Sequence, residues 1–244
     1  MKLNADLGES YGYWQFDADT NVMPYIDMAN IACGYHAGDA NSMHAAISLA
    51  KKYGVDIGAH PSYPDLQGFG RRSMRIPRPE LTNMIHAQIA MLEGMAKCQQ
   101  SALSYIKPHG ALYNDMMKNQ HIFEDVIHAL SAYHTNYPVV IQALPDNQLH
   151  HSIASDSDID VMFEAFCDRA YDASGYLVSR EVKGAVLDHE QSVNQALSII
   201  EHGLIQSIDG KDITVKADTL CVHGDNPQAL AITKALRSFI DNGH

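Results

Sequence analysis

The chain has 244 residues, 46% of them hydrophobic, and a formal net charge of −12 at pH 7 with histidine counted as neutral. A chain of this length buries roughly 70% of the surface that it exposes when unfolded, and no linker or low-complexity run divides it, so we expect one domain over residues 1–244. Its acidity argues against a nucleic-acid partner, which would need clustered Lys and Arg side chains, and no run is apolar for long enough to span a membrane.

Seven short segments along the chain have the pattern of strands. In the first, apolar Leu3 and Ala5 alternate with polar Asn4 and Asp6, which is the period of a strand. The later segments are small or apolar throughout, as in strands that are covered on both faces. The predicted strands are residues 2–6, 28–33, 55–60, 103–107, 138–143, 160–167 and 219–225.

Helical patterns separate most of these strands. Asn41 is the predicted cap of the first helix, and Pro79 and Pro227 open two others, because proline suits the first turn of a helix. The predicted helices are residues 42–53, 79–99, 122–133 and 192–201, with a last helix from residue 227. Residues 170–188 show no clear period and are interpreted as an insertion, and residues 207–214 as a turn or small hairpin.

The alternation of strands and helices predicts an α/β fold with parallel strands and right-handed crossovers. Seven units indicate a closed or nearly closed (β/α) barrel of the TIM-like kind. Histidines follow the second, third, fourth and seventh strands, at His36, His60, His109 and His223. In a barrel these would meet at the carboxyl end, where barrel enzymes hold their chemistry, whereas an open sheet would bring together only those near its switch point.

Polar residues at or just after the strand ends form the candidate site. Any one histidine there would equally suit a hydrogen-bonded structural role, but four at equivalent ends favour function. Imidazole and carboxylate groups can serve as acids and bases, and Lys or Arg can stabilise an anion. The candidate catalytic residues are Asp6, Glu9, His36, His60, His109, Asp168 and His223. The candidate contacts to substrate or ATP are Asn4, Asp39, Arg71, Arg72, Lys107, Glu164, Arg169 and Asp225.

A divalent metal is one interpretation of part of this set. Asp6, His36 and His60 offer a carboxylate and two imidazoles, which suit zinc, manganese or a similar ion with open positions for water. The alternative is a hydrogen-bonded network without metal, since the three residues lie at separate strand ends and form no local metal motif.

The four cysteines are far apart in sequence, at Cys33, Cys98, Cys167 and Cys221. They form no C-x-x-C pair, so neither a zinc knuckle nor a redox motif is indicated. The start of the chain also lacks a secretory apolar core. We therefore expect a cytoplasmic protein with reduced thiols.

Six segments resemble, in order, the motifs of the lactam-utilisation (LamB/YcsF) family, which comprises A subunits of bacterial ATP-dependent 5-oxoprolinase. They are LNADLGES (3–10), NIACGYHAGD (30–39), GAHPSYPDLQGFGRR (58–72), KPHGALYN (107–114), EAFCDRAY (164–171) and CVHGD (221–225). The resemblance covers nearly the whole chain. It departs from the usual family pattern at Ala5, Ser62 and Cys167, where Cys, Gly and Ala are common, and Ser62 puts the approach of its loop to substrate in doubt.

The resemblance implies a barrel of the glycoside hydrolase/deacetylase type. It also implies opening of 5-oxoproline (pyroglutamate) to glutamate coupled to ATP hydrolysis, with ATP as cosubstrate and Mg²⁺ as its companion, and with B and C partner subunits. Opening a lactam requires activation of its carbonyl, for which Lys107 and the arginines are candidates, and then a base and an acid.

Two other functions fit the same residues. One is a metal-dependent amide or carbohydrate deacylase that acts without ATP. The other is a non-catalytic subunit that binds a lactam and presents it to partner subunits.

Overall fold

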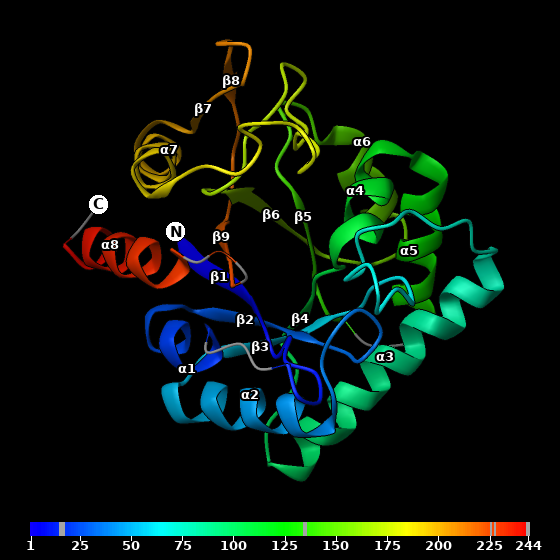
Figure 1. The fold of residues 1–244 in the computed structure, drawn as a ribbon. Coiled ribbons are helices and arrows are strands. Elements are labelled where there is room, and N and C mark those ends of the chain that lie inside the picture. The colour runs from blue at the N-terminus through cyan, green and yellow to red at the C-terminus, as the bar shows by residue number, and fades with distance from the viewer. Residues whose placement is uncertain (15–17, 134–135, 225, 227, 243–244) are drawn as a thin grey trace.

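The computed structural model describes residues 1–14, 18–133, 136–224, 226 and 228–242. Its centre is a closed barrel of parallel strands in the order β1-β2-β3-β4-β5-β6-β9, which confirms the predicted seven-stranded barrel (Figure 1). The barrel strands are β1 (Lys2–Leu7), β2 (Met28–Ala32), β3 (Asp56–His60), β4 (Tyr105–Ile106), β5 (Val139–Gln142), β6 (Val161–Phe166) and β9 (Thr219–His223). The fourth is shorter than predicted and directly precedes Lys107 and Pro108.

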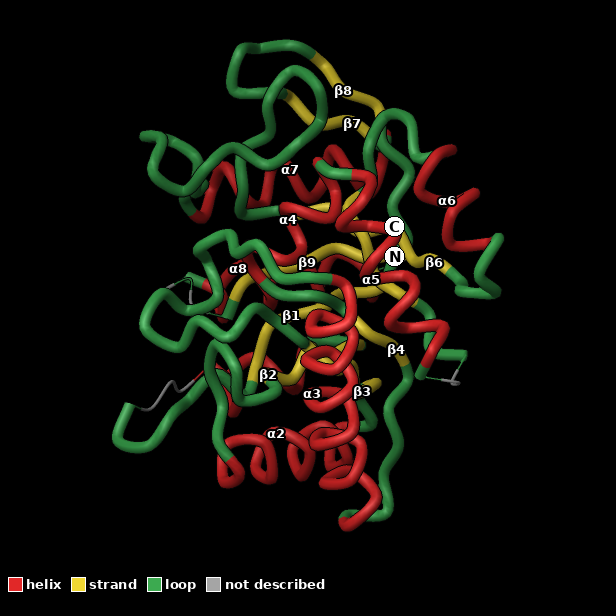
Figure 2. The backbone as a smooth tube through the Cα atoms, turned by 90° about the vertical axis from the view of Figure 1, so that its right-hand side faces the viewer, coloured by secondary structure: helices red, strands yellow, loops and turns green. Residues whose placement is uncertain are grey.

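Helices surround the barrel, and many of the long loops gather on one side of it (Figure 2). The helices are α1 (Ala18–Val22), the 3-10 helix η1 (Met23–Tyr25), α2 (Ala40–Tyr53), α3 (Arg78–Cys98), α4 (Gly110–Lys118), α5 (Gln120–Ala132), α6 (Gln148–Ser155), α7 (His189–His202) and α8 (Ala229–Asp241). The strands β7 (Leu204–Gln206) and β8 (Asp212–Thr214) pair antiparallel outside the barrel, in the region predicted as a turn or hairpin. Among the described residues, no helix is both long and apolar enough to cross a membrane.

The alternation in β1 separates the outside of the barrel from its inside. Leu3 and Ala5 are fully buried and belong to the large apolar cluster that also includes residues of the surrounding helices. Asn4 and Asp6, on the other face, bond to polar side chains within the barrel. A small separate cluster of Met28, Tyr105 and Val140 fills the interior near the beginnings of their strands. The interior is therefore apolar at its base and polar above it.

Close packing in the lower interior requires a glycine in β3. A Cβ atom on Gly58 would lie 2.1 Å from Cε2 of Tyr105, a ring that is only 1% exposed. The absence of a side chain at position 58 thus makes room for Tyr105, whose hydroxyl supports the polar layer.

The first long helix begins differently from the prediction. Asp39, and not Asn41, is the N-cap of α2: its carboxylate accepts from the backbone N–H groups of Asn41 and Ser42, each at 2.9 Å. The Asp39 N–H in turn donates to the Ser42 hydroxyl oxygen at 2.7 Å, so the two residues form a capping box. The Asp39 carboxylate also accepts a hydrogen bond from the Gly12 N–H at 2.8 Å, which links the loop after β1 to the start of α2.

Candidate functional site

A pocket of about 500 Å³ opens at the carboxyl end of the barrel. Side chains at or just after the ends of five barrel strands line this pocket. Most of the predicted site residues therefore lie in or next to it. Its lining includes the predicted residues Asp6, His60, Arg71, Arg72, Lys107, His109, Arg169 and His223.

A buried lysine occupies the floor of this pocket. Lys107 Nζ lies 3.1 Å from Asp6 Oδ1 and 3.0 Å from Glu164 Oε2, and it also donates to Asn4 Oδ1 at 3.2 Å. Burial alone lowers the pKa of Lys107, but the neighbouring carboxylates raise it well above its ordinary value. Conversely, burial raises the pKa of Asp6, while Lys107 and His60 hold it well below its ordinary value. The ammonium and the Asp6 carboxylate thus remain charged together.

The layer beneath the lysine is a continuous hydrogen-bond network. Asn30 donates to Asn4 Oδ1 and Asp6 Oδ1, each at 2.8 Å, and accepts from the Tyr105 hydroxyl at 2.7 Å. The predicted contacts Asn4 and Glu164 belong to this layer and are fully buried. Asn30 and Tyr105 were not among the predicted residues, although Asn30 stands at an inward position of β2, next to Asp6 in the register of β1.

Two polar atoms of the described residues, Glu164 Oε1 and the Tyr113 hydroxyl, are buried here without a hydrogen bond to any other group. They lie near each other, and burial followed by the charge and hydrogen bonding of the Glu164 carboxylate raises the pKa of Tyr113. Tyr113 lines the pocket and was not predicted. Its hydroxyl therefore lies next to the Glu164 carboxylate at the wall of the pocket.

Three histidines and an acid lie together at one side of the pocket. His36 and His109 stack in parallel, with ring centroids 3.7 Å apart, and His60 stands edge-on to both. His109 Nδ1 lies 2.9 Å from His60 Nε2, and Glu9 Oε1 lies 3.3 Å from His36 Nε2. Burial, followed by the charge of a neighbouring histidine, lowers the pKa of both His36 and His109 well below the ordinary value. These rings are therefore neutral at pH 7.

Within the described ranges, potential metal ligands fall into two groups. Ligand atoms of Glu9, His36, His60 and His109 all lie within 4.8 Å of one another, and so do those of Asp6, Cys221 and His223. The trio predicted from the sequence, Asp6 with His36 and His60, is thus divided between these groups. The reason is that Asp6 faces Lys107 and Asn30 inside the barrel, whereas His36 lies beyond the end of β2.

An acid–imidazole pair lies at the ends of β6 and β9. His223 Nδ1 is 2.8 Å from Asp168 Oδ1, and Asp168 Oδ2 accepts from the His223 N–H at 3.2 Å and from Asn226 Nδ2 at 3.3 Å. Burial raises the pKa of Asp168, but the pairing with His223 outweighs it and leaves the pKa below its ordinary value. A carboxylate at Nδ1 fixes the proton there, so Nε2 of His223 is the acceptor.

Four arginines line the pocket: Arg71, Arg72, Arg169 and Arg180. Arg169 is 5% exposed and donates to the carbonyl oxygens of Val178 at 2.6 Å and Ala185 at 3.2 Å. Burial and the nearby charge of Arg180 lower the pKa of Arg169 to about 10. Arg180 was not a predicted site residue, because it lies in the segment without a clear period. Clustered guanidinium groups favour an anionic ligand.

Other predicted residues have structural partners or lie outside the description. The Arg72 side chain donates to Asp65 through Nε at 2.9 Å, and this pair shapes the loop between β3 and α3. Asp39 caps α2, as described above, and does not line the pocket. Asp225 lies outside the described residues, as does Pro227, the predicted start of the last helix.

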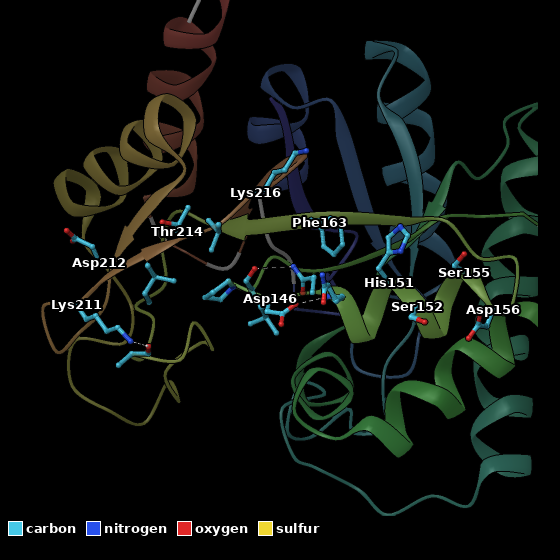
Figure 3. A pocket seen from close by; sticks show the side chains of 17 residues that line it. Asp146, His151, Ser152, Ser155, Asp156, Phe163, Lys211, Asp212, Thr214 and Lys216 are labelled. Carbon is cyan, nitrogen blue, oxygen red and sulfur yellow. Dashed lines mark hydrogen bonds between the residues drawn. The ribbon is translucent and has the colours of Figure 1, made fainter.

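A larger hollow of about 1,130 Å³ lies between α6 and the β7–β8 hairpin (Figure 3). Its charged side chains are spread around it: Asp146 and Asp156 flank α6, and Lys211 directly precedes β8. Lys211 donates to the Ala173 carbonyl at 3.3 Å. The convergent acid–base groups are therefore in the smaller pocket, which we take as the candidate active site.

Comparison with known proteins gives consistent results. Residues 1–244 match the model of the LamB/YcsF family. The chain is 45% identical to the 5-oxoprolinase A subunit of Vibrio campbellii, over 100% of this chain and 96% of that protein, and 48% identical to the 5-oxoprolinase A subunit of Vibrio cholerae, over 99% and 98%. The crystal structure of a lactam utilization protein from Thermus thermophilus superposes with a TM-score of 0.89 at 35% identity, covering 99% of this chain and 96% of that one.

Proposed function

Because the chain belongs to the LamB/YcsF family along residues 1–244, as its motifs predict, we propose that it is the A subunit of an ATP-dependent 5-oxoprolinase. In this function the complex converts 5-oxo-L-proline to L-glutamate with hydrolysis of ATP. The observation that carries the proposal is the identity of 45–48% to proteins named as A subunits of 5-oxoprolinase, over nearly their whole length.

The pocket has the chemistry that ring opening requires. The substrate carries a carboxylate, and Arg169 and Arg180 supply positive charge for it or for a phosphate group. A lactam is a resonance-stabilised amide, so its carbonyl must be activated, most simply by transfer of a phosphoryl group from ATP to the carbonyl oxygen. Water then adds to the activated carbon, and the ring nitrogen leaves with a proton. Cationic side chains favour the first step and a base favours the second.

We assign the base to His223. Its Nδ1 is held by Asp168 at 2.8 Å, which leaves Nε2 to accept a proton from water, and the side chain lines the pocket. Asp168 does not need to exchange a proton in this scheme, because it holds the imidazole in one tautomer and stabilises its charged form. Asp6 and Lys107 form the floor against which the lactam would rest.

ATP and the partner subunits complete the proposal. We infer that ATP, with Mg²⁺, is the cosubstrate and that the B and C subunits of the complex contribute to its binding. We also place the complex in the cytoplasm. The four free cysteines support a reducing compartment.

The test is reconstitution of the chain with its B and C subunits, with glutamate and ADP both measured. His223→Asn and Asp168→Asn should each lower kcat by about 10²–10⁴-fold with the complex still assembled. Arg180→Gln should chiefly raise KM, by about tenfold. As a matched control, His121→Asn changes an imidazole that is 89% exposed on α5 and should leave both constants unchanged.

Three outcomes would contradict the proposal. Absence of 5-oxoproline turnover in an assembled complex would remove the function itself. Full activity of His223→Asn would remove the assigned base. Hydrolysis of an amide or acetylated sugar by the chain alone, without ATP, would favour the metal-dependent deacylase instead, and ligand binding without any effect of His223→Asn on chemistry would favour a non-catalytic binding subunit.

A further inference from the structure

The protons on two of the clustered histidines are fixed by backbone carbonyl groups. His60 Nδ1 lies 2.6 Å from the Lys107 carbonyl oxygen, and His109 Nε2 lies 3.0 Å from the Phe69 carbonyl oxygen. A carbonyl oxygen only accepts, so each of these nitrogens carries the hydrogen. The remaining nitrogen of the neutral His109 ring, Nδ1, holds a lone pair and lies 2.9 Å from His60 Nε2. His60 Nε2 also lies 3.4 Å from Asp6 Oδ1, so both second nitrogens point into the space between the rings and the acids.

The third histidine repeats this arrangement. The Ser62 hydroxyl lies 2.9 Å from the Tyr63 carbonyl oxygen and 2.9 Å from His36 Nδ1, so it is placed to accept a hydrogen from Nδ1. In that tautomer His36 Nε2 holds a lone pair and lies 3.3 Å from Glu9 Oε1. Four buried ligand atoms, one each from Glu9, His36, His60 and His109, thus converge within 4.8 Å of one another. A cation placed between them would bind all four.

We propose that Glu9, His36, His60 and His109 bind one divalent transition-metal ion, such as zinc or manganese. Three imidazole nitrogens and one carboxylate oxygen are ligands that these ions prefer, whereas magnesium and calcium prefer oxygen alone. Ligand atoms about 2.1 Å from an ion lie about 3.0–3.4 Å from one another in octahedral or tetrahedral geometry. The separations here are 2.9 Å for His60 with His109, 3.3 Å for His36 with Glu9 and 3.8 Å for His109 with Glu9.

The surroundings of the rings also suit a metal site. Histidine ligands in proteins almost always donate their second N–H to a carbonyl, a carboxylate or water, which fixes the ring and its tautomer. All three rings here have such an acceptor, provided by Lys107, Phe69 and Ser62.

The parallel stacking of the His36 and His109 rings predicts that metal binding changes their orientation. Their planes differ by 5°, so one ion cannot lie in both ring planes at once. Binding of the ion must therefore tilt one of these rings and open the stack. His60, at 82° to His109, needs no such change.

A shared proton is the competing occupant, because it would also separate His60 Nε2 from His109 Nδ1. A proton on His60 Nε2 would bond to His109 Nδ1 at 2.9 Å and would also face Asp6 Oδ1 at 3.4 Å, so a metal titration is needed to distinguish the two occupants. The metal proposal does not depend on which reaction the pocket performs. A bound ion there would act as a Lewis acid beside the pocket, because His60 and His109 line it.

The test uses the full chain, stripped with a chelator and titrated with Zn²⁺ and Mn²⁺ by calorimetry, with metal content measured after removal of excess ion. We expect one ion per chain. His60→Asn should weaken binding at least 100-fold and Glu9→Gln at least tenfold, while His121→Asn, on the surface, should bind as the parent does. Co²⁺ gives a second readout, because its visible absorption bands should shift in Glu9→Gln even if His60→Asn does not fold.

The proposal is overturned if the parent chain retains no ion, or if Glu9→Gln and His60→Asn bind as tightly as His121→Asn. Either result would leave the proton as the occupant of the cluster. Because these measurements need neither ATP nor partner subunits, failure of the metal site and failure of 5-oxoproline turnover are distinguishable.

Discussion

Replacement of Lys107 by Met tests whether the floor of the pocket depends on one buried charge. The Met side chain keeps most of the length of lysine but removes the ammonium. It therefore leaves the carboxylates of Asp6 and Glu164, which are 6% and 0% exposed, without their shared cation.

The expected loss follows from the burial of those acids. Removal of one partner from a buried ion pair costs about 3–5 kcal/mol, because the remaining charge is uncompensated. Lys107→Met should destabilise the chain by this amount. Adding Glu164→Gln to the variant removes one unpaired charge and should recover about 1–3 kcal/mol. A matched control is Lys97→Met on α3, where the lysine pairs with Glu93 but is 67% exposed, and the expected change is below about 0.5 kcal/mol.

Urea denaturation followed by far-ultraviolet circular dichroism measures these differences. The single tryptophan, Trp14, is 72% exposed and so is a poor reporter of the core. If Lys107→Met were no more destabilising than Lys97→Met, or if Glu164→Gln worsened it, the electrostatic interpretation of the floor would be refuted.

Three further changes test other parts of the structure. Gly58→Ala should cost about 2 kcal/mol or more, a fall in Tm of roughly 4–8 °C, because its Cβ would overlap the Tyr105 ring; an unchanged Tm would contradict this packing. Asp39→Ala should cost about 1 kcal/mol in thermal unfolding through loss of the α2 cap, and reduced turnover with unchanged Tm would instead indicate a role in the site. For Asp168, burial raises the pKa, but the interaction with His223 lowers it by more, so the folded-state pKa is below the unfolded value of about 3.9. The Asp168 carboxylate therefore contributes its full stability above about pH 3.9 and loses it as the pH falls through the lower folded-state pKa. Asp168→Asn should flatten the profile of Tm between pH 3 and 4, and parallel profiles would argue against this linkage.

The sequence predicted the barrel because its strands and helices alternate with strong periodicity. It did not predict α1, α4 and α6, which have 5, 9 and 8 residues, because so few turns give little periodic signal. Among the described residues, neither α4 nor α6 has a side-chain cap hydrogen bond, so the usual start signal is also absent. The cap of α2 was misplaced by two residues because Asp39 and Asn41 are both good caps, and only the position of Ser42 distinguishes them.

For the site, the rule that strand ends converge placed His36, His60 and His109 in one region, as the structure shows. The rule does not say which side chains touch. That depends on the register of neighbouring strands and on rotamers, and these set Asp6 against Lys107 and placed Glu9 beside His36. Arg180 could be found only as a basic residue in a long loop at the carboxyl end of the barrel, which is a weak signal.

The two polar layers of the barrel differ in how their charges are balanced. In the lower layer Lys107 lies between Asp6 and Glu164, and the amides and Tyr105 hydroxyl around them are paired, so this layer is largely neutralised from within. Such a layer provides a rigid support.

In the upper layer, ligand atoms of three histidines and Glu9 converge within 4.8 Å of one another, and the nearby charge of Arg180 lowers the pKa of Arg169. The repulsion between the two guanidinium groups costs stability in the absence of an anion, and proteins retain such costs chiefly at functional sites. A cation at the histidines and an anion at the arginines would each find groups of complementary charge or lone pairs already gathered. Each ligand should then stabilise the folded chain, by about 2.7 kcal/mol at a hundred times its Kd, so affinity and stability in this pocket have the same electrostatic origin.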